Sequence, residues 1–67
     1  PELMKARAAL NETFGKMSKS ALYGNEELLA FQKSGKAIVD EGDPTQVYAL
    51  KVAWDKELDK KKKGGSK

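Results

Sequence analysis

The fold is decided by residues 42–58, GDPTQVYALKVAWDKEL. Gly42 is typical of the position just after a helix. Asp43 followed by Pro44 is typical of a helix start, because aspartate caps the first turn and proline suits the first helical position. We therefore predict a helix boundary here. Beyond it, apolar residues recur at the spacing of one helical face: Val47, Leu50, Trp54 and Leu58.

The same stretch also fits a β-hairpin over residues 36–54. In that alternative, Ala37–Val39 forms one strand, and the chain turns at Gly42-Asp43-Pro44. The second strand would use the alternating apolar residues from Tyr48 to Trp54. We favour the helix because its apolar stripe continues to Leu58, which strand alternation does not explain.

Two further helices are predicted upstream. Residues 1–17 carry one apolar stripe at helical spacing, and residues 25–41 carry another, which includes Gly35. A glycine at that position weakens a helix or lets another backbone approach it. The link at Tyr23-Gly24-Asn25 has turn chemistry, with Gly24 expected at positive φ and Asn25 expected to cap the next helix.

We therefore expect an all-α protein, a small three-helix (or helix-hairpin) bundle with a flexible basic C-terminal tail. The helical domain would comprise residues 1–59, and the lysine-rich flexible tail residues 60–67. The chain of 67 residues has 13 basic residues and 10 acidic residues. Five of the lysines and none of the acids lie in the tail, so the body is mildly acidic.

The composition excludes several kinds of chemistry. The chain has no cysteine and no histidine, which removes thiolate metal sites, cysteine nucleophiles and the commonest general base. Its serines have no base to activate them, and its carboxylates lack the spacing of a calcium loop. We expect no enzyme, no metal, no cofactor and no small-molecule substrate. Without cysteine, signal peptide or membrane-spanning segment, the sequence predicts a cytoplasmic protein in a reducing compartment.

Residues 16–20, KMSKS, resemble the nucleotide-binding signature of class I aminoacyl-tRNA synthetases. The resemblance implies that Lys16 and Lys19 contact ATP phosphates, and that they lie in a Rossmann fold with a histidine-containing partner motif. It covers five residues, and the chain has no histidine. The alternative is a helix C-terminus at which lysines complement the helix dipole.

The sequence therefore predicts a non-enzymatic protein-protein interaction module, an assembly factor or a regulator. It would act through the apolar face of the third helix and bind a larger protein or a second copy of itself. Tryptophan and tyrosine are frequent anchors of such interfaces. The predicted interface residues are Tyr48, Val52, Trp54 and Leu58.

The alternative function is non-specific nucleic-acid binding. The lysine tail, together with a basic first helix, would hold phosphates without reading sequence. The residues predicted for this contact are Lys60, Lys61, Lys62 and Lys63.

Overall fold

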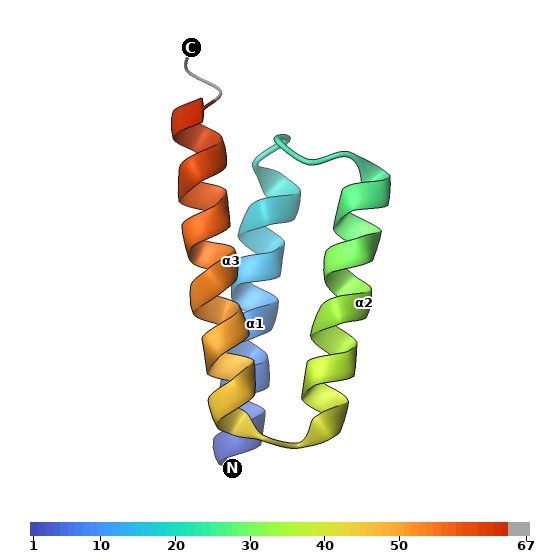
Figure 1. Ribbon diagram of the computed structural model, residues 1–67, viewed down its shortest axis with the longest axis vertical. Coiled ribbons are helices and arrows are strands. Elements are labelled where there is room, and N and C mark those ends of the chain that lie inside the picture. The colour runs from blue at the N-terminus through green and yellow to red at the C-terminus, as the bar shows by residue number, and fades with distance from the viewer. Residues whose placement is uncertain (65–67) are drawn as a thin grey trace.

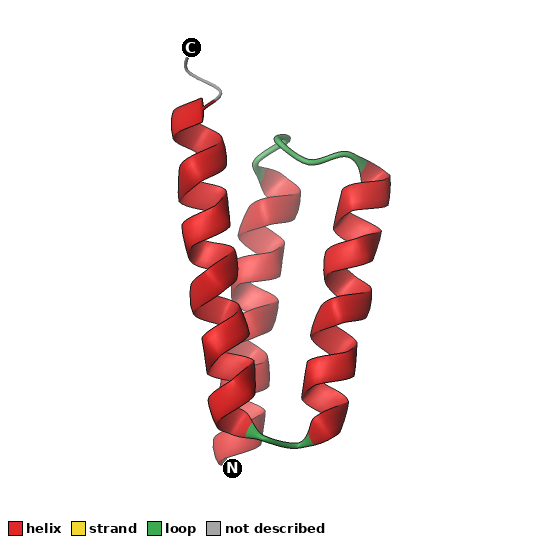
Figure 2. Cartoon of the chain, viewed as in Figure 1, coloured by secondary structure: helices red, strands yellow, loops and turns green. Residues whose placement is uncertain are grey.

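The structure, a computed structural model, describes residues 1–64 of the chain. They form three α-helices joined by short links (Figure 1): α1 (Glu2–Lys19), α2 (Asn25–Glu41) and α3 (Pro44–Gly64). No strand occurs among the described residues (Figure 2). The all-α three-helix bundle is confirmed, and the β-hairpin alternative for residues 36–54 is wrong.

The helices lie side by side in an elongated bundle of 40 × 19 × 15 Å. α1 and α3 run in the same direction, and α2, which lies between them in the sequence, runs in the opposite direction (Figure 1). Short links favour contact between consecutive helices. The most closely packed pair is nevertheless α1 and α3, which are not consecutive, and α2 lies less closely against both.

The boundary between α2 and α3 has the predicted chemistry. Gly42 adopts a left-handed conformation with φ 80°, and its N–H donates to the carbonyl of Val39. The side chain of Asp43 accepts a hydrogen bond of 3.0 Å from the N–H of Thr45, in the first turn of α3. Pro44 is the first residue of α3. The two helices therefore meet at a sharp turn that is fixed locally.

The link between α1 and α2 differs from the prediction. Gly24 is extended, with φ −76°, and the left-handed residue is Ala21, with φ 61°. The chain reverses directly after α1 ends, where the Ser20 hydroxyl donates to the carbonyl of Met17, so the unusual backbone falls before the glycine.

α2 begins at Asn25, as predicted, but its N-cap lies one residue earlier than expected. Gly24 is the N-cap, and Asn25 is already the first helical residue. The N–H of Gly24 donates to the Glu27 carboxylate at 2.9 Å. The Glu27 side chain in the first turn thus accepts the hydrogen bond of the N-cap N–H, and the expected asparagine cap is not formed.

The core is centred on Trp54 of α3. Its ring lies 6.1 Å from that of Phe14 on α1 and 5.5 Å from that of Phe31 on α2, measured between centroids. By contrast, Gly35 is the one residue of α2 that is buried. The core is therefore built mainly by α1 and α3. Its buried apolar side chains are Ala6, Leu10, Met17, Tyr23, Val47, Trp54 and Leu58.

α3 continues past residue 59, where we expected the flexible tail to begin. Residues 60–64 extend the helix without interruption. Lys61 packs against Tyr23, and Lys63 pairs with Asp59 one turn earlier. These side-chain contacts stabilise the last turn of the helix. The remainder of the predicted tail, residues 65–67, lies outside the described residues.

Candidate functional site

The structure divides the predicted interface on α3 into two parts. Trp54 and Leu58 are both buried in the core. Tyr48 and Val52 are exposed, with 38% and 47% of their surface accessible. The four residues therefore do not form one surface, and an interface through Trp54 or Leu58 would require the bundle to open.

Helical geometry explains the division. Trp54 and Leu58 share the face of α3 that Val47 also occupies, and this face turns toward α1. Tyr48 and Val52 lie one turn apart from each other but well round the helix from that face. We call Tyr48 and Val52 the α3 edge.

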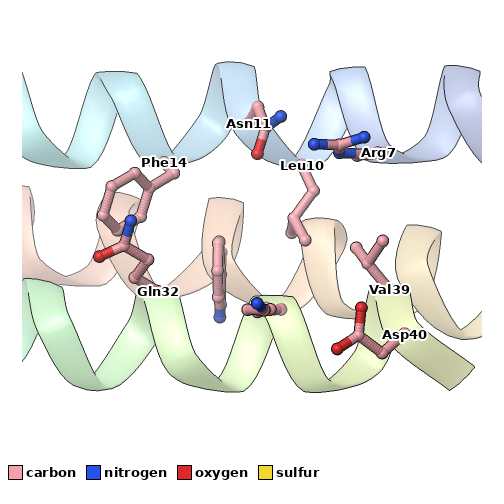
Figure 3. A pocket seen from close by; sticks show the side chains of 10 residues that line it. Arg7, Leu10, Asn11, Phe14, Gln32, Val39 and Asp40 are labelled. Carbon is pink, nitrogen blue, oxygen red and sulfur yellow. The ribbon is translucent and has the colours of Figure 1, made fainter.

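A groove of about 430 Å³ runs between α1 and α2 (Figure 3). Its apolar lining comes from all three helices. The apolar lining residues are Leu10, Phe14, Gly35, Val39 and Trp54.

Polar side chains from α1 and α2 form the rim of the groove. Arg7 and Asp40 lie at the same end of it, on opposite walls, and Phe14 and Gln32 lie toward the other end (Figure 3). The full polar set is Arg7, Asn11, Gln32, Lys36 and Asp40. An apolar floor under a few convergent polar groups is the usual make-up of a ligand site.

This groove was not predicted from the sequence. Arg7 and Asn11 are four residues apart, as are Gln32, Lys36 and Asp40, so each set lies on one helical stripe. That spacing was the signal in the sequence from which the two polar walls of the groove could have been predicted. It does not show that the two stripes face each other, because this depends on how α1 and α2 pack.

Two of the four predicted nucleic-acid lysines make contacts within the chain. The Nζ of Lys61 lies 5.2 Å from the centroid of the Tyr23 ring and 3.7 Å from the Glu27 carboxylate. The Nζ of Lys63 lies 3.3 Å from the Asp59 carboxylate. Lys60 is exposed one turn before Lys63 on the same face of the helix, and Lys62 is exposed on a different face. The run is thus distributed around α3.

Beside Lys61, Tyr23 holds a buried hydroxyl that has no hydrogen-bond partner among the described residues. Burial raises the pKa of this phenol, and the carboxylates of Glu57 and Glu27 raise it further, because both disfavour a phenolate. The Tyr23 ring meets that of Phe31 edge-on, with centroids 5.5 Å apart. Tyr23 therefore serves the packing of the bundle end.

A polar contact also joins α1 to α3. The buried Thr13 hydroxyl donates a hydrogen bond of 2.9 Å to Asp55, and the Lys51 ammonium lies 2.6 Å from the same carboxylate. Hydrogen bonding to Lys51 is the main cause that lowers the pKa of Asp55, and the bond from Thr13 acts in the same direction. The same ion pair raises the pKa of Lys51.

The segment that resembles the synthetase signature ends α1. Lys16 and Lys19 lie in the last turn of this helix, and Met17 between them is fully buried. The described residues contain no strand, so the Rossmann fold that the resemblance implies is absent from them. In this position the two lysines complement the helix dipole.

Residues 1–64 contain no cluster of three metal-binding side chains, and none of their helices combines the length and apolarity needed to cross a membrane. Tyr23, Lys51 and Asp55, the groups with shifted pKa, are not among the groove's lining residues.

Comparison of the chain with protein families, curated proteins and solved structures finds no match.

Proposed function

We propose that this chain is a non-enzymatic interaction module that docks a protein partner through the α3 edge. The observation that carries the proposal is the exposure of Tyr48 and Val52 on a helix whose other large apolar side chains are buried or, at Leu50, partly buried. Tyrosine is enriched at interface hot spots, since it offers a large rigid ring and a hydroxyl. The interface predicted from the sequence is thereby reduced to Tyr48 and Val52, because Trp54 and Leu58 are in the core.

The test pairs an edge variant with a matched control. A photo-crosslinking amino acid at position 48 identifies the partner, which is then purified, and its affinity for the chain is measured. We expect the double variant Tyr48→Ser, Val52→Ser to weaken binding by about tenfold or more. The control Met4→Ser, Leu29→Ser removes two other exposed apolar side chains and should leave the affinity unchanged. Equal losses in both variants contradict the α3 edge.

Self-association is measured in the same series. Sedimentation equilibrium over a range of concentrations shows whether the partner is a second copy of the chain. In that case the dimer dissociates in the edge variant and persists in the control variant. A monomer at all concentrations directs the search to a different protein.

Non-specific phosphate binding is a second candidate, favoured by one observation. Lys56, Lys60 and Lys63 recur at i, i+4 and i+7 and line one shallow hollow on α3. Asp59 lies in the same hollow and reduces its positive charge. We therefore expect weak binding that falls steeply with salt.

Fluorescence anisotropy with labelled duplex DNA and single-stranded RNA tests this candidate. The variant Lys56→Gln, Lys60→Gln, Lys63→Gln should weaken binding and flatten the salt slope by about one unit for each phosphate contact that is lost. Substitution is preferable to truncation after Asp59, which would also remove the contact between Lys61 and Tyr23. Binding that is unchanged in this variant excludes the lysine hollow.

A further inference from the structure

We propose that the groove between α1 and α2 binds a small amphipathic anion. The ligand has an apolar body of one or two rings, or a short alkyl chain, and carries a carboxylate or sulfonate group. This site is separate from the α3 edge, so either proposal can fail without the other.

The size and floor of the groove suit the apolar body. Its volume of about 430 Å³ lies in the range of pockets that hold small molecules, about 300 to 1,000 Å³. Phe14 and Trp54 both contribute to the lining, and aromatic rings offer flat apolar surface for stacking. The neighbouring Leu10 and Val39 add aliphatic surface. A bound ring would shield the partly exposed Phe14 and Val39 from water, as well as its own apolar surface, and gain the corresponding free energy.

The charge of the rim suits the anionic group. Arg7 on the α1 wall and Lys36 on the α2 wall are cations, whereas Asp40 is the one carboxylate among the lining residues. Arginine can donate two parallel hydrogen bonds to a carboxylate or sulfonate. Asn11 and Gln32 offer further donors on the two walls. The low-dielectric floor beneath the rim strengthens these attractions relative to open water.

The dimensions favour a small molecule over a docked helix. The lining residues span positions 7–14 of α1 and 32–40 of α2, which is about two turns of each helix, or roughly 12 Å along the bundle. A partner helix in a groove typically uses apolar anchors over a longer stretch, within an interface of about 800 Å² on each side. One compact ligand matches the available length.

The experiment uses anilinonaphthalene sulfonate as the probe and its uncharged analogue phenylnaphthylamine as the chemical control. Nitrogen–proton correlation spectra of the full chain locate the probe. We expect shifts at residues 7–14 and 32–40 and at the indole N–H of Trp54, the one tryptophan of the chain. Shifts that centre on the α3 edge or on Lys60–Lys63 overturn the proposal.

Charge variants then test the anion preference. Arg7→Gln and Lys36→Gln should each weaken sulfonate binding by about fivefold to tenfold, and Asp40→Asn should tighten it by about twofold to threefold. Lys33→Gln, an exposed lysine on α2 outside the groove lining, should change nothing. All four sites are exposed, so the fold should tolerate the changes.

Two outcomes contradict the proposed ligand class. If phenylnaphthylamine binds as tightly as the sulfonate, the groove is an apolar site without preference for an anion. If Asp40→Asn weakens binding as much as Lys36→Gln does, the rim charges do not act on the ligand. The edge variant Tyr48→Ser, Val52→Ser should bind the sulfonate as the wild type does, which separates this site from the docking proposal.

Discussion

Gly35 of α2 lies directly against the indole ring of Trp54 on α3. A Cβ built on Gly35 would stand 2.8 Å from Cη2 of Trp54, closer than real Cβ atoms come to other heavy atoms. The ring cannot retreat easily, because it also packs against Phe14 and Phe31. Because glycine has no side chain, α2 can approach the core closely at this position. The same contact sets the depth of the groove.

Gly35→Ala should destabilise the protein even though alanine is the better helix former. Overpacking against Trp54 costs about 1–3 kcal/mol, and the gain in helix propensity returns about 1 kcal/mol. The free energy of unfolding from urea denaturation measures the balance. The control is Gly15→Ala in α1, where a new Cβ meets nothing within 4 Å and should stabilise by about 0.5–1 kcal/mol. Gains of equal size at both sites would contradict the close approach.

Asp55→Asn should remove a contribution to the free energy of unfolding that depends on pH. The pKa of Asp55 is lower in the folded protein, so its contribution is present above the unfolded pKa of about 4 and is lost as the pH falls through the folded pKa. We expect Asp55→Asn to cost about 0.5–1 kcal/mol at neutral pH, a small value because the carboxylate is partly exposed.

Urea denaturation of both proteins between neutral and acid pH checks this prediction. The difference in unfolding free energy should shrink as the pH falls below about 4, the unfolded pKa, and through the lowered folded pKa of the wild-type carboxylate. Asparagine keeps an oxygen that can accept the hydrogen bond from Thr13, so the loss reports mainly on Lys51. A difference that stays constant with pH would assign the effect to packing.

Tyr23→Phe should stabilise the protein slightly, by about 0.5 kcal/mol, because a buried hydroxyl without a partner is lost and the ring contacts remain. The raised pKa of Tyr23 also predicts a loss of wild-type stability as the pH rises above about 10 and through the folded pKa. That part of the alkaline decline should be missing in Tyr23→Phe. Thermal denaturation over an alkaline pH series measures both effects, and the exposed Tyr48→Phe is the matched control.

The helices could be predicted from the sequence because their signals are local. The sequence of Gly42, Asp43 and Pro44 specifies a helix end and the next helix start within three residues. The apolar stripe of α3 was long enough to separate a helix from a strand. The same local reasoning erred at Gly24, since the position of a left-handed residue depends on where α1 ends, and this boundary lies at Lys19.

The candidate sites were harder to predict because they depend on packing between helices. Trp54 and Tyr48 are both aromatic residues of the same helix, and the sequence does not show which of them the core takes up. The contact between Gly35 and Trp54 joins positions on different helices. The groove arises from the same relationship, because its walls are polar stripes that resemble ordinary solvated faces until α1 and α2 are placed side by side.

Lys61 should hold the last turns of α3 against the rest of the bundle. Its ammonium lies over the Tyr23 ring and near Glu27, which joins the end of α3 to the start of α2. Lys61→Met keeps the apolar stem and removes the charge, and we expect it to cost about 0.5–1 kcal/mol. Lys62→Met, the next position on an exposed side of the helix, should cost less.

Amide hydrogen exchange resolves where this loss falls. In Lys61→Met, exchange should accelerate over the last turns of α3 and stay unchanged around Trp54, because the contact ties down a helix end that is distant from the core. Glu27→Gln then separates the two contacts, since glutamine still accepts the N–H of Gly24 but carries no charge. If Glu27→Gln reproduces the whole effect of Lys61→Met, the ion pair holds the helix end. If exchange stays slow in Glu27→Gln, the aromatic ring of Tyr23 holds it.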